Sequence, residues 1–163
     1  GRDHAGLRAA IRPNTKFIFC EMIGNPALDV LDVVEGGETA GRLGLAVCYD
    51  LRFPELFRRL ADLGAEWFCL PSAFTAPTGR AHWETLLRAR AVENLCHVVA
   101  PAQSGFHENG RETHGDSMIV DCWGRVLARL PRGTGVVVAD IDLVRQREVR
   151  QNFPSLDHRR LRS

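Results

Sequence analysis

The sequence is poor in lysine, because Lys16 is the single lysine among its 21 basic residues. Any mechanism that needs a catalytic lysine therefore has one candidate. The formal net charge of +1 at pH 7 gives no reason to expect a nucleic acid or an acidic partner. The sequence also lacks an apolar run approaching the ~20 residues that cross a bilayer, so we expect no membrane association.

The five cysteines form no CxxC pair and show no Cys/His spacing typical of a metal site. Their odd number, with no secretory leader, favours a reducing compartment, with the cytoplasm as the default. An alternative is a metal site around Asn109-Gly110, formed by His107, Glu108, Glu112 and His114. Asn-Gly with polar neighbours is more typical of an exposed turn, so we predict no metal and no cofactor.

Hydrophobic patterns predict one α/β domain with seven strands and two helices. The predicted strands are 15–20, 43–48, 66–70, 97–102, 117–121, 125–130 and 135–141, and the predicted helices are 54–64 and 81–95. Alternation of strand and helix from residue 43 to 102 indicates parallel strands, because antiparallel neighbours need only short turns. Cys122-Trp123-Gly124 indicates a hairpin turn, and the arginine-rich tail 143–163 is typical of an arm, a short helix or a frayed terminus.

Cys48 ends an apolar strand pattern and begins a turn, and a helical pattern follows at Pro54. A side chain at such a corner projects beyond the carboxyl edge of the sheet, where a substrate can reach it. Free cysteines usually behave as small buried hydrophobes, and the other four lie inside or beside apolar patterns. Cys48 is therefore a candidate nucleophile, and a thiol in this role needs a base, a cation or a helix dipole nearby.

Residues 41–55, GRLGLAVCYDLRFPE, resemble the nucleophile segment of the nitrilase, or carbon-nitrogen hydrolase, superfamily. Four later blocks resemble the amidase branch in the same order: LPSAF at 70–74, HWE at 82–84, RARAVEN at 88–94 and HGDSMIVD at 114–121. The resemblance covers about residues 33 to 161. It implies an α/β fold that is part of a four-layer αββα sandwich, and assembly as a homo-oligomer.

The same resemblance implies that Cys48 attacks the carbon of a small-molecule amide, such as an ω-amide. Ammonia leaves, and water then hydrolyses the thioester. The backbone N–H of Tyr49 would bind the oxyanion. The residues implied to line the substrate pocket are Ala73, Phe74, His82 and Trp83.

Charged residues at helical spacing have a simpler interpretation. Arg88, Arg90 and Glu93 are expected to form ion pairs or to face water. His97, at the start of an apolar strand, is expected to be a structural histidine with a hydrogen-bond partner.

Two expected catalytic groups are missing from the sequence. Members of the family use a glutamate base and a lysine that precede the cysteine, and neither motif occurs here. Lys16 lies inside an apolar strand pattern, and Glu21 and Glu35 lack the matching context. We therefore expect little amidase activity from this chain alone. The alternative is a non-catalytic scaffold or assembly module with the same half-fold.

Residues 11–32 resemble a strand and loop of the pyridoxal-phosphate enzymes of cysteine and methionine metabolism, with Asn25 at a position that lies near the cofactor in that family. The Schiff-base lysine, the aspartate for the pyridine nitrogen and the phosphate loop are absent, so this segment cannot hold the cofactor by itself. We predict two pieces joined near 32–39. They are an N-terminal segment, 1–32, foreign to the hydrolase family, and a carbon-nitrogen hydrolase portion, 33–163.

Overall fold

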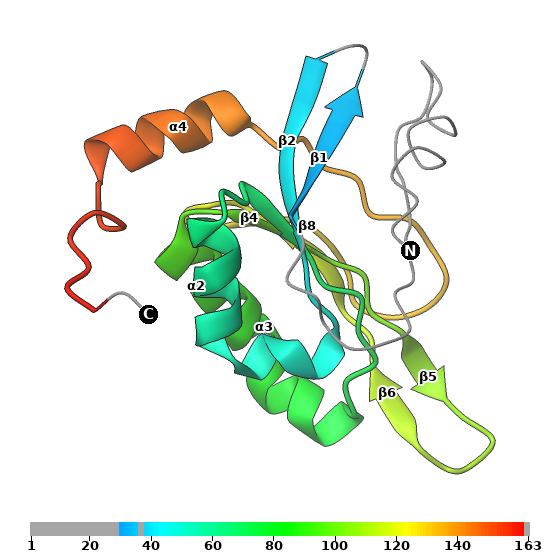
Figure 1. Ribbon diagram of the computed structural model, residues 1–163. Coiled ribbons are helices and arrows are strands. Elements are labelled where there is room, and N and C mark those ends of the chain that lie inside the picture. The colour runs from blue at the N-terminus through cyan, green and yellow to red at the C-terminus, as the bar shows by residue number, and fades with distance from the viewer. Residues whose placement is uncertain (1–29, 36–37, 162–163) are drawn as a thin grey trace, which may run out of the picture.

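The main feature of the fold is a six-stranded sheet, seen in a computed structural model that describes residues 30–35 and 38–161 (Figure 1). The strand order is β1-β2-β3-β4-β7-β8. These strands are β1 (Val30–Glu35), β2 (Glu38–Leu45), β3 (Trp67–Cys69), β4 (His97–Ala100), β7 (Ser117–Val120) and β8 (Val126–Leu130). The strand predicted at 15–20 lies outside the described residues.

The centre of the sheet is parallel, as predicted. β2 pairs with β3 and β3 with β4 in parallel, whereas β1, β7 and β8 pair antiparallel with their neighbours. The crossovers are α2 (Pro54–Asp62) and α3 (Ala76–Asn94), which cover one face of the sheet (Figure 1). The α/β class is confirmed, and α2 and α3 form one helical layer on the six-stranded sheet.

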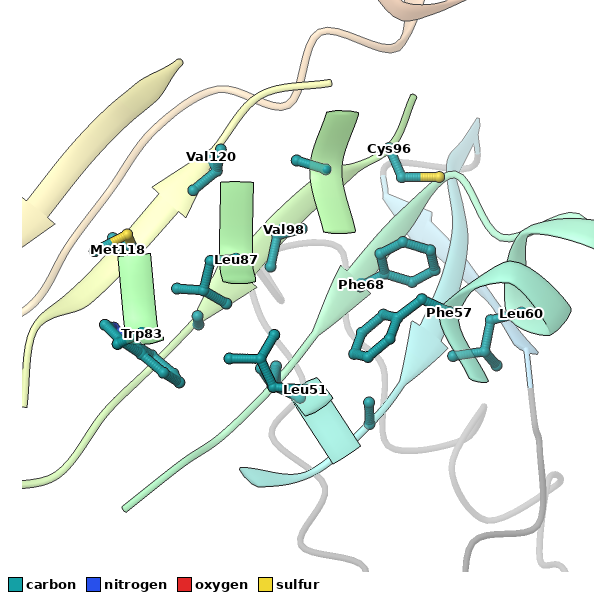
Figure 2. Packing of buried hydrophobic residues seen from close by; sticks show 14 of the residues in the cluster. Leu51, Phe57, Leu60, Phe68, Trp83, Leu87, Cys96, Val98, Met118 and Val120 are labelled. Carbon is teal, nitrogen blue, oxygen red and sulfur yellow. The ribbon is translucent and has the colours of Figure 1, made fainter. Parts of the chain in front are cut away.

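The hydrophobic core lies between this sheet face and the two helices (Figure 2). Phe57 of α2 meets Phe68 of β3 edge to face, with ring centroids 5.2 Å apart. Trp83 and Leu87 of α3 are buried in the same cluster. No helix among residues 30–35 and 38–161 is long and apolar enough to cross a membrane.

Helix α2 begins at Pro54 as predicted, but α3 begins at Ala76, five residues before the predicted start. Pro77 and Gly79 make this stretch look like a loop. Proline is nevertheless favoured in the first turn of a helix, where its missing N–H costs nothing. Gly79 is required by packing, because a Cβ there would lie 2.2 Å from the Cβ of His114.

Two hairpins follow β4. Residues 121–125 connect β7 to β8 with Gly124 at φ +82°, as the sequence predicts. The second hairpin pairs β5 (Ser104–Phe106) with β6 (Glu112–His114). Its tip is a turn in which the Gly110 N–H donates to the His107 carbonyl at 2.9 Å. The turn predicted at Asn109-Gly110 is confirmed, and no group of three potential metal ligands occurs among the described residues.

The strand predicted at 135–141 is wrong. Two of its three consecutive valines are exposed, Val136 by 87% and Val138 by 80%, and no described strand pairs with the segment. An apolar run alone does not form a strand, because the backbone also needs a partner for its hydrogen bonds. Ile141, at its end, packs against the sheet face that α2 and α3 leave uncovered, beside Trp67 and Cys69.

The tail contains a short helix, α4 (Leu143–Asn152), which is tied to the sheet rather than frayed. Its N-cap Asp142 accepts from the Arg145 N–H at 2.9 Å. Gln146 is 1% exposed, and its amide donates to the Glu66 carbonyl at 2.9 Å. Its Oε1 lies 2.7 Å from His97 Nδ1. The Gln146 oxygen can only accept, so His97 donates, and the prediction that His97 is structural is confirmed.

This contact predicts a pH dependence of stability. Burial lowers the pKa of His97 from its ordinary value of 6.5, against the opposing effect of the Gln146 hydrogen bond. Below pH 6.5 the unfolded chain therefore binds more protons at His97 than the folded chain, and the unfolding free energy falls as the pH falls. Urea unfolding between pH 8 and 5.5 should show a smaller decrease for His97→Gln than for the wild type. Equal slopes in the wild type and His97→Gln would contradict the assignment.

Candidate active site

Cys48 lies just beyond the carboxyl end of β2, at the edge where parallel strands place ligands in α/β folds. It is the first residue of a 3₁₀ turn, η1 (Cys48–Arg52), and its φ of +45° lies in the left-handed region. The Cys48 N–H donates to the Pro71 carbonyl at 2.9 Å. Pro71 follows β3, so the neighbouring strand holds the corner in place.

Burial separates Cys48 from the other described cysteines. Cys48 is half-buried, whereas Cys69, Cys96 and Cys122 are buried, and all four are thiols rather than disulfides. Burial raises the pKa of the Cys96 thiol to about 12, and it also raises the pKa of Cys122. Cys48 is therefore the described thiol that reagents can reach, and Cys20 lies outside the described residues.

The turn after Cys48 is closed by its own residues. The Val47 N–H donates to Asp50 Oδ2 at 2.8 Å, and the Asp50 N–H donates to the Val47 carbonyl at 2.9 Å. The backbone N–H of Tyr49 has no acceptor among the described residues. It is therefore free to bind an oxygen beside the thiol.

Arg52 is not among the predicted site residues, yet it connects three of them. Its guanidinium carbon lies 5.2 Å from the ring centroid of Tyr49 and 5.0 Å from that of Phe74. Its Nη1 lies 3.2 Å from His82 Nδ1, and arginine can only donate, so His82 accepts. The sequence does contain a signal for this role, because Arg52 is a cation that lies four residues after the thiol of Cys48 within a predicted turn.

The other two predicted pocket residues lie differently. Ala73 is exposed, on the segment that follows β3. Trp83 is 1% exposed, and its indole N–H donates to the Asp116 carbonyl at 2.7 Å. The Trp83 ring packs 4.9 Å from the Phe74 ring, measured between centroids. Trp83 therefore supports Phe74 from the core side, and the assignment of the pocket stays a prediction.

The ion pairs expected for Arg88 and Arg90 are confirmed, and Arg90 makes a further contact. Arg88 is more than half exposed and pairs with Glu84 at 3.7 Å, as expected. Arg90 pairs with Glu93 at 2.9 Å, but its side chain is only 5% exposed. Its Nε and Nη2 both donate to the Leu51 carbonyl, a contact between residues 39 positions apart that helical spacing cannot reveal.

A cavity of about 230 Å³ lies between the start of α3 and the end of β8, and none of the predicted site residues lines it. Its lining consists of Ala76, Arg80, His114, Asp116, Arg129, Pro131 and Arg132. Arg129 donates to both carboxylate oxygens of Asp116, at 2.6 and 2.7 Å, and Arg132 pairs with Glu112 at 2.6 Å. These ion pairs neutralise most of the charge of the cavity lining. We therefore favour the corner at Cys48, rather than this cavity, as the candidate site.

A comparison of the sequence with models of known protein families identifies the family of this chain. The model of the family described as "Carbon-nitrogen hydrolase" matches residues 12–151, which is most of the chain. The chain belongs to the carbon-nitrogen hydrolase family. The resemblance of residues 41–55 and the later blocks is thereby confirmed at the level of the family.

Several curated relatives are named as amidases. The deaminated glutathione amidase of Homo sapiens is 55% identical over 121 residues, covering 74% of this chain and 37% of that protein. The Synechocystis enzyme of the same name is 52% identical over 122 residues, covering 75% and 45%. The chain thus spans less than half the length of these relatives. They support amide hydrolysis and give no support to a non-catalytic module.

Solved structures confirm the nitrilase-type fold. The NitFhit protein of Caenorhabditis elegans is 45% identical with a TM-score of 0.77, covering 85% of this chain and 32% of that chain. Another is an amidase from Nesterenkonia sp. AN1, 31% identical with a TM-score of 0.62, covering 81% and 51%. That structure shows Michael addition of acrylamide at the active-site cysteine of the amidase.

The comparisons give no support to the resemblance to pyridoxal-phosphate enzymes. The match to the hydrolase family begins at residue 12, inside the segment that carried this resemblance. That segment, including Asn25 and Lys16, lies almost entirely outside the described residues. The division into segments 1–32 and 33–163 stays a prediction.

Proposed function

We propose that this chain carries the nucleophile of an amidase that converts a small-molecule ω-amide to a carboxylate and ammonia. The observation that carries the proposal is the half-buried Cys48 at a left-handed corner beyond the carboxyl end of β2. The amidase names of the curated relatives and the active-site cysteine of the Nesterenkonia enzyme support it.

The proposed reaction has two steps. The Cys48 sulfur bonds to the amide carbon and the C–N bond breaks, while the nitrogen takes up a proton and leaves as ammonia. Water then attacks the thioester, the C–S bond breaks, and a carboxylate and the free thiol result. The Tyr49 N–H is the proposed donor to the oxyanion of each step. Ala73, Phe74, His82 and Trp83 are the proposed pocket residues, with Trp83 acting from behind Phe74.

Arg52 adds a proposed role to this pocket. Its guanidinium lies against two aromatic rings beside the turn that carries the thiol. A guanidinium binds a carboxylate well, because its N–H groups match the two oxygens. We therefore propose that the amide substrate carries a carboxylate at its other end.

The setting of the reaction belongs to the same proposal. Cys48 must remain a thiol to act, which fits a reducing compartment such as the cytoplasm. Assembly as a homo-oligomer remains a proposal. The glutamate and lysine motifs that the family resemblance implies are missing from this sequence, so turnover of an unactivated amide by this chain alone should be slow.

Acylation is the step to test, because an activated ester needs no proton on its leaving group. The chain is mixed with p-nitrophenyl acetate, and intact-mass analysis with peptide mapping locates the adduct. We expect one acetyl group on Cys48, formed faster than on a model thiol such as N-acetylcysteine. Acetylation of Cys48 no faster than the model thiol would overturn the proposal.

A further inference from the structure

Arg90 is a buried cation on α3, and all three of its guanidinium nitrogens are bonded. Nε and Nη2 donate to the Leu51 carbonyl at 3.0 and 2.8 Å, and Nη1 donates to Glu93 Oε1 at 2.9 Å. The guanidinium carbon also lies 5.5 Å from the ring centroid of Phe57. Burying a charge is unfavourable unless it is paired and hydrogen-bonded, so this arrangement needs every one of these contacts.

The acceptor belongs to the turn that carries the thiol. Leu51 is the fourth residue of η1, which begins at Cys48, and the last carbonyls of a helical turn lack partners within it. Two donors from one guanidinium occupy the acceptor sites of the Leu51 oxygen. Leu51 itself is fully buried against the core (Figure 2). The second half of η1 is thus fixed by α3 through one side chain.

The first half of η1 needs such support. Cys48 has a φ of +45°, and a non-glycine residue keeps this unfavourable conformation only where its surroundings impose it. One restraint is the bond from the Cys48 N–H to the Pro71 carbonyl. The bonds from Arg90 to the Leu51 carbonyl restrain the other end of the same turn.

We propose that Arg90 is a positioning residue that fixes η1, so that the Cys48 sulfur and the Tyr49 N–H face the same carbonyl group. This inference rests on the proposed function. Lysine cannot replace arginine here, because an ammonium group cannot place two coplanar donors on one carbonyl and a third on Glu93. The role differs from that of Arg88, two residues earlier, whose Nε donates to the Gly124 carbonyl in the β7–β8 turn.

Two reagents for the same thiol separate positioning from general stability. Acetylation by p-nitrophenyl acetate forms an oxyanion that the Tyr49 N–H can bind, whereas alkylation by iodoacetamide displaces iodide and forms none. The measured quantity is the ratio of the two rate constants at Cys48, followed by peptide mapping. We expect Arg90→Lys to lower this ratio by about tenfold, because small displacements of reacting groups have large effects on rate. General loosening of the fold changes access for both reagents and does not produce this change.

The matched control is Arg88→Lys, which alters an arginine on the same helix that bonds to a different loop. Its ratio should stay within twofold of the wild type. If Arg90→Lys does not fold, as judged by circular dichroism, Glu93→Ala takes its place. This variant keeps both donors to Leu51 but frees the third nitrogen, and we expect a threefold or larger decrease in the ratio.

Failure of this inference is distinct from failure of the proposed function. A folded Arg90→Lys variant with the wild-type ratio, or the same decrease in Arg88→Lys, would overturn the positioning role while Cys48 remained the nucleophile. A wild-type chain whose ratio equals that of N-acetylcysteine would instead overturn the proposed function.

Discussion

Replacing Cys48 with serine is expected to slow acyl transfer from p-nitrophenyl acetate at this position by at least about 100-fold. A serine hydroxyl is a far weaker nucleophile than a thiolate when no base activates it. Serine is close to cysteine in size, so the turn that begins at residue 48 should keep its bonds to Pro71 and within η1. Intact-mass analysis over time measures the loss directly.

The control for this substitution is Cys122→Ser in the β7–β8 turn. Cys122 is 2% exposed, and burial raises its pKa, so its thiol should contribute little to acylation. This variant should acylate at the wild-type rate. An adduct that persists in Cys48→Ser and disappears in Cys122→Ser would contradict the prediction, because it would identify Cys122 as the reactive thiol.

The position of Cys48 was predictable because the signals for it are local. An apolar run, a turn and a proline at the start of a helix follow one another within residues 43–54. The parallel order of β2, β3 and β4 followed from the intervening helices for the same reason, since a crossover needs a long connection.

Several contacts of buried polar side chains were not predictable, because they join distant parts of the chain. Arg88 and Arg90 are the same residue type two positions apart, yet Arg90 is buried and bonded to Leu51. Gln146 is polar and lies in an arginine-rich tail, but partners at His97 and Glu66 satisfy its amide inside the protein. A polar side chain can be buried where hydrogen-bond partners are present, and the local sequence does not show these partners.

The strand predicted at 135–141 was wrong because a local signal was present without a distant partner. The segment has the apolar run of a strand, but no described strand offers a ladder of hydrogen bonds. The start of α3 was placed too late because Pro77 and Gly79 break helices in general. Here proline occupies the first turn, and glycine allows the close approach of His114.

Replacing Trp83 with alanine is expected to lower the unfolding free energy by about 3–5 kcal/mol. The side chain is 1% exposed, packs on Phe74 and donates to the Asp116 carbonyl, so its loss leaves a cavity and an unpaired buried oxygen. Trp83→Phe keeps most of the packing and should lose about 1–3 kcal/mol, the cost of the unsatisfied carbonyl. Urea unfolding at pH 8 measures both changes.

Trp123 provides a matched control for this prediction. It is 54% exposed in the β7–β8 turn and contacts Phe153 edge to face at 5.6 Å. Trp123→Ala removes the same group with much less burial, and should lower the unfolding free energy by about 1 kcal/mol or less. A loss for Trp83→Ala as small as that expected for Trp123→Ala would contradict the prediction. A large loss for Trp83→Ala alone would show that Trp83 stabilises the core. Trp83 packs on Phe74, and Phe74 in turn contacts Arg52 of the turn that carries the thiol.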